Sequence, residues 1–268
     1  MKRITGLSAF TLIIGLLYQS CSVVPLTGRK QINLLPESEM ISMGFTNYSD
    51  FMKENPPSTD RSNSAVVKEV GNSISAAVNK YFTENNLQSR LEGYQWEFNL
   101  VNNNTPNAWC MPGGKVVVYS GILPFTQDNN GLAVVMSHEI AHAVARHGNE
   151  RMSQQLLTQL GGIALNEAIK QKPEETRKIF LTAYGIGSQV GVLLPYSREH
   201  ELEADKLGLI FMAMAGYDPQ TAVAFWERMA SSGGDKPPEF LSTHPSDATR
   251  ISRIKAAIPE ALKYYNKN

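Results

Sequence analysis

The sequence predicts an α+β fold that is mostly helical, with one small sheet of antiparallel or mixed strands. Apolar and polar residues alternate over residues 94–100, and residues 115–119 are rich in β-branched side chains, both of which are typical of strands. Before and after that stretch, apolar residues recur at spacings of three and four, which is typical of amphipathic helices. The chain has 268 residues, 42% of them hydrophobic and 19% charged, which is enough for one sizeable core.

Two helices and three strands are expected in the N-terminal half. The helices cover residues 37–54 and 64–81, and the second carries its valines and Ile74 on one face. The strands cover residues 94–100, 107–111 and 115–119, with a Pro-Gly-Gly turn before the last. We expect this small sheet to pack on the helix that follows it.

The C-terminal half is predicted to be helical. Asn129 or Asn130 can cap a helix that runs through Val144. The apolar stretches 156–169 and 180–194 are rich in Gly and Ala, and they are too short and too polar to predict membrane spans. Three further helices can be capped by Ser197, Asp218 and Ser246. Pro259 is expected near the start of the last helix.

The first twenty residues are expected to be a lipoprotein signal peptide. A basic start is followed by an apolar run, Ala9 to Leu17, that is too short to span a bilayer. Ser20 directly precedes Cys21, as in a bacterial lipobox, so Cys21 is the predicted lipidation site. Tyr18 and Gln19 are atypical of a lipobox, which leaves an uncleaved signal anchor or ordinary cleavage near Ser20 as alternatives.

Charge and cysteine content exclude several classes of protein. Lys plus Arg and Asp plus Glu both number 25, and no basic run is present, so nucleic acid is not an expected partner. Cys21 and Cys110 are too few for a disulfide framework. Prolines 56 and 57 mark a boundary. We therefore divide the chain into a signal peptide (1–20), a tether and N-terminal segment (21–61) and a catalytic domain (62–268).

A metal site is indicated by His138-Glu139-Ile140-Ala141-His142. On a helix, His138 and His142 lie on one face and can bind one ion, and Glu139 can reach a metal-bound water as general base. A catalytic zinc needs a third protein ligand, and Glu201 on the helix after Ser197 supplies it. Asp205, one turn later, can accept an N–H from a ligating histidine. One zinc ion per chain is predicted.

Other acidic and histidine side chains lie near these motifs. Glu199 and Glu203 are predicted to be solvated, because each lies on a different part of the helix surface from Glu201. His147 would point about 140° from His142 on an ideal helix, so a structural role is predicted. His200 is predicted to be structural or to support a ligand. His244 is expected within a loop, residues 241–245, that ends in a helix cap, and it could stabilise an oxyanion, fill the fourth zinc position at rest or be structural.

The strand formed by Lys115, Val116, Val117, Val118 and Tyr119 is a candidate substrate-binding element. As an edge strand beside the cleft, it could pair with an extended substrate through main-chain hydrogen bonds. Such pairing recognises backbone, so it suits unfolded polypeptide and broad cleavage. The alternative is that this strand lies inside the sheet.

These motifs together resemble a known family. The resemblance is carried by residues 25–34 (PLTGRKQINL), 107–115 (NAWCMPGGK), 138–142 (HEIAH), 197–205 (SREHELEAD) and the later Thr243-His244-Pro245 and Arg250-Ile251. They are similar to motifs of the HtpX-, Oma- and Ste-type zinc metallopeptidases, peptidase family M48, and within it the bacterial periplasmic lipoprotein branch.

The resemblance implies a zincin-like domain with His138, His142 and Glu201 as zinc ligands, Glu139 as base and Asp205 behind a ligand. It also implies an endopeptidase that hydrolyses unfolded, damaged or misassembled envelope proteins in quality control. The expected location is the bacterial outer membrane, facing the periplasm, with attachment through the N-terminal lipid. Two other functions remain open: a tethered chaperone whose zinc site is structural or plugged by His244, and a processing peptidase with one substrate.

Overall fold

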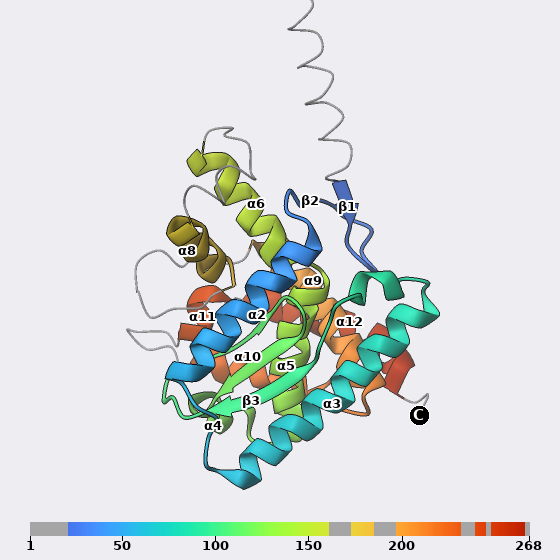
Figure 1. Cartoon of the computed structure of the whole chain (residues 1–268). Coiled ribbons are helices and arrows are strands. Elements are labelled where there is room, and N and C mark those ends of the chain that lie inside the picture. The colour runs from blue at the N-terminus through green and yellow to red at the C-terminus, as the bar shows by residue number, and fades with distance from the viewer. Residues whose placement is uncertain (1–20, 161–172, 185–196, 232–238, 245–247, 266–268) are drawn as a thin grey trace, which may run out of the picture.

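The computed structural model describes residues 21–160, 173–184, 197–231, 239–244 and 248–265. Its centre is a three-stranded sheet of β3 (Glu97–Val101), β4 (Ala108–Met111) and β5 (Lys115–Tyr119). The strand order is β3-β5-β4, with β3 parallel and β4 antiparallel to β5. Figure 1 shows helix α2 crossing the front of this sheet and α5 running behind it. The predicted α+β class with a small mixed sheet is confirmed.

The helices that enclose the sheet begin and end close to the predicted positions. They are α2 (Glu37–Glu54), α3 (Arg61–Glu84) and α5 (Asn129–Val144). The short helix α4 (Leu123–Thr126), which was not predicted, precedes α5. The predicted cap of α5 is wrong by one or two residues. Asp128 is the cap, and its carboxylate accepts a hydrogen bond from the Gly131 N–H at 2.8 Å.

The remaining helices follow α5. They are α6 (His147–Leu160), α8 (Pro173–Ala183), α9 (Arg198–Met214), α10 (Thr221–Ser231), α11 (Glu239–Thr243) and α12 (Ala248–Tyr265). Ser197 caps α9 as predicted, accepting the His200 N–H at 3.2 Å. The predicted cap Ser246 and most of the 156–169 and 180–194 stretches lie outside the described residues. No helix in the described part of the chain is both long enough and apolar enough to cross a membrane.

Pro259 was predicted near the start of the last helix, but it lies inside α12. Proline removes one main-chain hydrogen bond from a helix interior. Pro259 is exposed, so water can bond to the carbonyl that loses its partner. The helix therefore continues through it.

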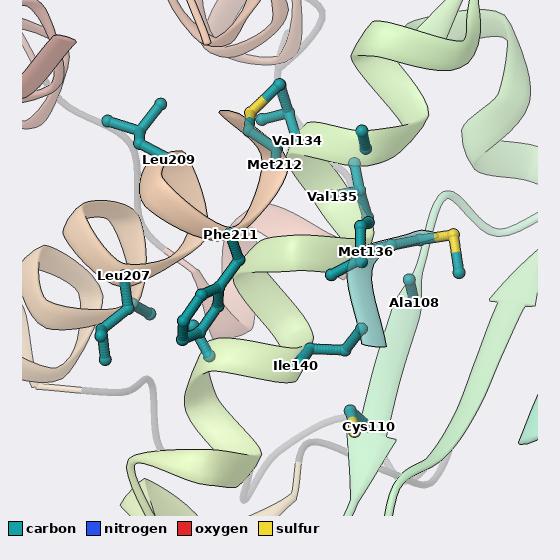
Figure 2. Close-up of a cluster of buried hydrophobic side chains, with 14 of the residues drawn as sticks. Ala108, Cys110, Val134, Val135, Met136, Ile140, Leu207, Leu209, Phe211 and Met212 are labelled. Carbon is teal, nitrogen blue, oxygen red and sulfur yellow. The ribbon is translucent and has the colours of Figure 1, made fainter. Parts of the chain in front are cut away.

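The two faces of the sheet contribute to two apolar clusters. Ala108, Cys110, Val116 and Val118 face α3, α5 and α9, and Figure 2 shows Ala108 and Cys110 on β4 beside Ile140 of α5. Trp109, Met111, Val117 and Tyr119 face the other way, into a cluster with α2, α6 and α8. Cys110 is 4% exposed, as expected of a small apolar core residue. The sheet therefore fixes the position of α5 from one side.

Helices α5 and α9 pack very closely where the predicted metal ligands lie. A Cβ atom added to Gly208 on α9 would come within 3.1 Å of the His138 main-chain nitrogen on α5. This distance is shorter than an ordinary van der Waals contact, so any side chain at this position would push the two helices apart by a few tenths of an ångström. This contact places the start of α9 beside the middle of α5.

The N-terminal segment packs on the same domain. It forms a two-stranded hairpin, β1 (Cys21–Val23) and β2 (Lys30–Ile32), in which the strands pair antiparallel. Val24 and Leu35 beside it are buried. β2 also contacts α6, the helix after α5. The predicted signal peptide, residues 1–20, lies outside the described residues.

Candidate metal centre

Four buried side chains converge at one point: His138, His142, Glu201 and His244. One donor atom from each lies within 4.8 Å of all the others, and none of the four residues is more than 3% exposed. His142 Nε2 lies 3.0 Å from His138 Nε2 and 3.3 Å from Glu201 Oε1. His244 Nδ1 lies 3.2 Å from His138 Nε2 and 3.0 Å from Glu201 Oε1. Residues as far as 106 positions apart in the sequence thus meet at a single site.

Helices α5 and α9 and the residue that follows α11 supply these groups. His138 and His142 are one turn apart on α5, so their rings lie one above the other with centroids 4.6 Å apart. Glu201 comes from the first turn of α9, which Ser197 caps. His244 directly follows α11, and its main-chain N–H donates to the Phe240 carbonyl at 2.8 Å. The end of α11 therefore fixes the fourth side chain.

Glu139 lies at the rim of this cluster. Its Oε1 is 3.3 Å from His244 Nε2, and the residue is 3% exposed. Burial raises the pKa of Glu139, against the opposing pull of His244 and His138. A carboxyl group with a raised pKa, close to the cluster but outside it, can accept and return a proton.

Asp205 lies behind His138, as predicted from the spacing on α9. Its Oδ1 is 3.0 Å from His138 Nδ1, the ring nitrogen on the far side from the cluster. A carboxylate at this position holds the proton on Nδ1 and leaves the Nε2 lone pair directed into the cluster. Although burial lowers the pKa of His138, hydrogen bonds to Asp205 and Glu201 raise it to about 9.

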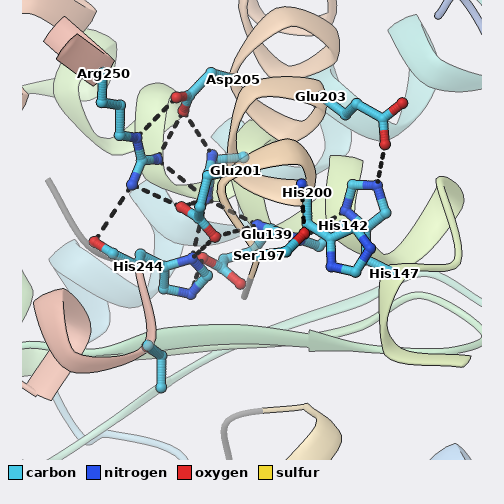
Figure 3. A network of polar contacts seen from close by, with 12 residues as sticks. Glu139, His142, His147, Ser197, His200, Glu201, Glu203, Asp205, His244 and Arg250 are labelled. Atoms are coloured by element: carbon cyan, nitrogen blue, oxygen red, sulfur yellow. Dashed lines mark hydrogen bonds and ion pairs between the residues drawn. The ribbon is translucent and has the colours of Figure 1, made fainter. Parts of the chain in front are cut away.

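Arg250, which belongs to one of the motifs similar to family M48 but had no predicted role, also lies at the site. Its Nη1 lies 2.6 Å from Glu201 Oε2, and its Nε and Nη2 each donate to an Asp205 oxygen at 2.8 Å. The guanidinium carbon lies 3.6 Å from the centre of the Trp226 ring. Figure 3 shows Arg250 bridging the two carboxylates above His244. Burial alone would raise the pKa of both acids, but Arg250 and the histidines hold the pKa of Glu201 well below its usual value.

The prediction for Glu203 was wrong. It is 6% exposed, its Oε2 lies 3.2 Å from His147 Nε2, and it accepts a hydrogen bond from Arg29 Nε at 2.8 Å. The partner cation stands 174 residues earlier in the chain, so helix periodicity gives no signal of it. Glu199 is exposed, as predicted.

His147 does not point away from His142. Helix α5 ends at Val144, and Arg146 adopts a left-handed φ of 64°, so the ideal-helix angle does not apply. The chain turns back, and His147 Nδ1 lies 2.9 Å from His142 Nδ1. His200 stacks on His147 with ring centroids 4.5 Å apart and bonds to Glu150 at 2.9 Å. Neither histidine belongs to the four-residue cluster, but His147 supports one of its members.

The strand of Lys115 to Tyr119 is not an edge strand. β5 pairs with β3 on one side and with β4 on the other, and all five of its residues are buried. Its nearly continuous run of valines is typical of a strand inside a sheet, which is the signal that could have identified it. The predicted pairing of substrate with residues 115–119 is therefore wrong. Within the described residues, β4 is the edge strand beside α5.

The donor set matches a zinc site. Imidazole nitrogens and a carboxylate oxygen are the ligands zinc takes in catalytic centres. The buried, convergent arrangement of three histidines and one glutamate could hold one such ion. Residues 71–258 match the model of a protein family described as Peptidase family M48. The chain belongs to peptidase family M48.

Membership in family M48 confirms the predicted enzyme class, a zinc-dependent metallopeptidase. The chain is 39% identical over 175 residues to the mitochondrial metalloendopeptidase OMA1 of Schizosaccharomyces pombe, covering 65% of this chain and 50% of that protein. It is 32% identical to human OMA1 over 274 residues, 98% of this chain and 51% of the relative. The beta-barrel assembly-enhancing protease of Escherichia coli is 31% identical over 163 residues, 59% of this chain and 33% of that protein. The chain thus spans about half the length, or less, of these relatives.

The expected location is corrected by the same comparisons. A lipid-anchored protein of the bacterial outer membrane was expected, but the relatives at 39% and 32% identity are mitochondrial proteases. Lipidation at Cys21 stays a prediction from the sequence.

Proposed function

We propose that this M48 protein is an endopeptidase that hydrolyses unfolded or misassembled polypeptides, with zinc held by His138, His142 and Glu201. The observation that carries the proposal is the convergence of these three side chains beside Glu139. Zinc, when bound, supplies a polarised water and charge stabilisation for a peptide carbonyl. Glu139 is placed to accept a proton from the attacking water and would return it to the leaving amine. Asp205 and Arg250 keep the ligands in place.

The edge position of β4 in the sheet supports the proposal that the substrate is an unfolded polypeptide. The Ala108 N–H already donates to the Asn107 side-chain oxygen at 2.9 Å. Tyr119 donates its N–H to the Asn107 carbonyl, so the alternation of an antiparallel pair directs the Ala108 carbonyl and the Cys110 N–H and carbonyl away from β5. An extended segment could pair with these groups irrespective of its side chains. The activity would then be broad, and a role in protein quality control follows from it.

The described conformation is closed. Glu139 and the four clustered residues are at most 3% exposed, and the β4 residues at most 4%. The Phe240 N–H of α11 bonds to the Pro106 carbonyl just before β4, which ties the His244 element to this edge. These contacts favour His244 as the fourth donor of a resting state, and they imply that α11 moves before a polypeptide can enter.

The proposal is tested with the full chain, casein as an unfolded substrate and a folded control protein, followed by mapping of the cleavage sites. We expect many cleavages in casein, few in the folded protein, and none after zinc is removed. His244→Ala is assayed beside it, and we expect it to cleave casein faster. If neither protein cleaves casein while each binds one zinc ion, the peptidase proposal fails and the chaperone alternative gains support. Cleavage at one site only would favour the processing peptidase.

A further inference from the structure

A chain of polar contacts connects the N-terminal hairpin to the metal centre. It begins at Arg29 in the hairpin, passes through Glu203 on α9 and His147 at the start of α6, and ends on His142. Figure 3 shows the inner part of this chain, with Glu203 contacting His147 and His147 lying beside His142. His147 is fully buried and Glu203 is 6% exposed.

The direction of each hydrogen bond follows from the role of His142. Its Nε2 lies among the other donors of the cluster, so a bound metal takes that lone pair and the proton must sit on Nδ1. His142 Nδ1–H then donates to His147 Nδ1, 2.9 Å away. His147 accepts on Nδ1 and carries its proton on Nε2, which donates to Glu203 Oε2 at 3.2 Å. Each step fixes the tautomer of the next ring.

Arg29 holds the outer end of this chain. Its Nε donates to Glu203 Oε2 at 2.8 Å, and its Nη1 and Nη2 donate to the two Glu150 oxygens at 2.9 and 2.7 Å. Thr27, from the same hairpin, donates its hydroxyl to Glu203 Oε1. A planar guanidinium with these bonds fixes the carboxylate in orientation as well as charge. Glu203 is therefore held in the position that His147 requires.

We propose that Arg29, Glu203 and His147 are positioning residues that orient the imidazole of His142 for zinc. The inference rests on the proposed function, because it takes His142 as a zinc ligand. It also gives the N-terminal hairpin a part in the metal site, which no motif of the catalytic helices indicates. Without Arg29, two carboxylates stay buried without their shared cation. Glu203 is then less restrained, His147 can turn, and His142 loses its acceptor.

The test is zinc affinity of the full chain, measured by competition with a chromophoric chelator. Groups that support metal-binding histidines change metal affinity roughly 10- to 100-fold when removed, so we expect a loss of that size for His147→Leu. His147→Asn places an amide oxygen where Nδ1 stood and should restore most of the affinity. Arg29→Gln and Glu203→Gln should weaken binding in the same direction. The exposed residues Arg61 and Glu199 provide the matched controls Arg61→Gln and Glu199→Gln.

The double variant Arg29→Gln/His147→Leu separates a connected chain from independent packing effects. If Arg29 acts through His147, the double variant binds zinc within about twofold of His147→Leu alone, because coupled changes do not add. If the losses of zinc affinity in the two single variants multiply in the double variant, the proposed connection from Arg29 to His142 is overturned. A zinc affinity of His147→Leu within twofold of the unaltered protein would also overturn it. If the unaltered protein itself binds no zinc, the proposed function fails and not this inference alone.

Discussion

Arg250 is expected to contribute more to the stability of the zinc-free protein than any other single cation near the site. Its guanidinium is the buried cation shared by Glu201 and Asp205, and all three side chains are at most 6% exposed. Removing one partner of a buried ion pair costs about 3–5 kcal/mol, because the other charge remains buried. Arg250→Met keeps an apolar chain on Trp226 and removes only the charge and the hydrogen bonds. We therefore expect the free energy of unfolding of the zinc-free protein to fall by about 3–5 kcal/mol.

The assay is urea and thermal unfolding of the zinc-free proteins. For a domain of this size, the expected loss lowers the midpoint temperature by about 6–20 °C. Arg253→Met, on the exposed side of the same helix, is the matched control and should stay within about 0.5 kcal/mol. Bound zinc should reduce the difference in the free energy of unfolding between Arg250→Met and the unaltered protein, because the ion supplies positive charge to Glu201. A loss below about 1 kcal/mol in Arg250→Met would refute the argument that Arg250 compensates these carboxylates.

Three further predictions follow from contacts around the site. Asp205→Asn should weaken zinc binding about 10- to 100-fold, because a neutral amide is a weaker acceptor for the His138 Nδ1–H and pairs poorly with Arg250. Competition with a chelator measures the affinity, and an unchanged value would contradict this prediction. Gly208→Val should lower the free energy of unfolding by about 1–3 kcal/mol, since the added Cβ would meet the α5 backbone. Urea unfolding measures this, and a free energy equal to that of the unaltered protein would show that the helices can separate freely. Glu150 is largely buried, but bonds from Arg29 and His200 hold its pKa at about 2, below its usual 4.5. Its stabilising contribution should be complete above about pH 4.5 and disappear as the pH falls through about 2. Glu150→Gln should therefore flatten the fall in zinc-free stability over this range, and an identical pH profile would contradict the assignment.

The parts of the site that are local in sequence could be predicted from the sequence. His138 and His142 are one helical turn apart, and helix geometry alone places them together. Glu201 and Asp205 share a face of α9 for the same reason. Helix positions 37–54 and the strands near residues 108–119 also followed from periodicity and turn residues.

The remaining features depend on contacts between distant segments. Arg250 meets Asp205 across 45 residues, and Arg29 meets Glu203 across 174. No local pattern marks these pairs. The turn of His147 toward His142 depends on the left-handed backbone at Arg146. Gly and Asn are the residues that usually indicate this conformation, and position 146 is neither. The central position of β5 depends on strand order, although its valine-rich composition was a usable signal.

The most direct test of the account is casein hydrolysis by Glu139→Gln beside the unaltered full chain, with zinc content measured in both. Should the closed site leave the unaltered chain inactive, the same pair is compared in the His244→Ala background. Glu139→Gln preserves the size of the side chain but removes the carboxylate that accepts the proton. The account predicts one zinc ion in each protein and a loss of hydrolysis of at least about 100-fold in Glu139→Gln. Hydrolysis that survives in Glu139→Gln with zinc retained would contradict Glu139 as the general base.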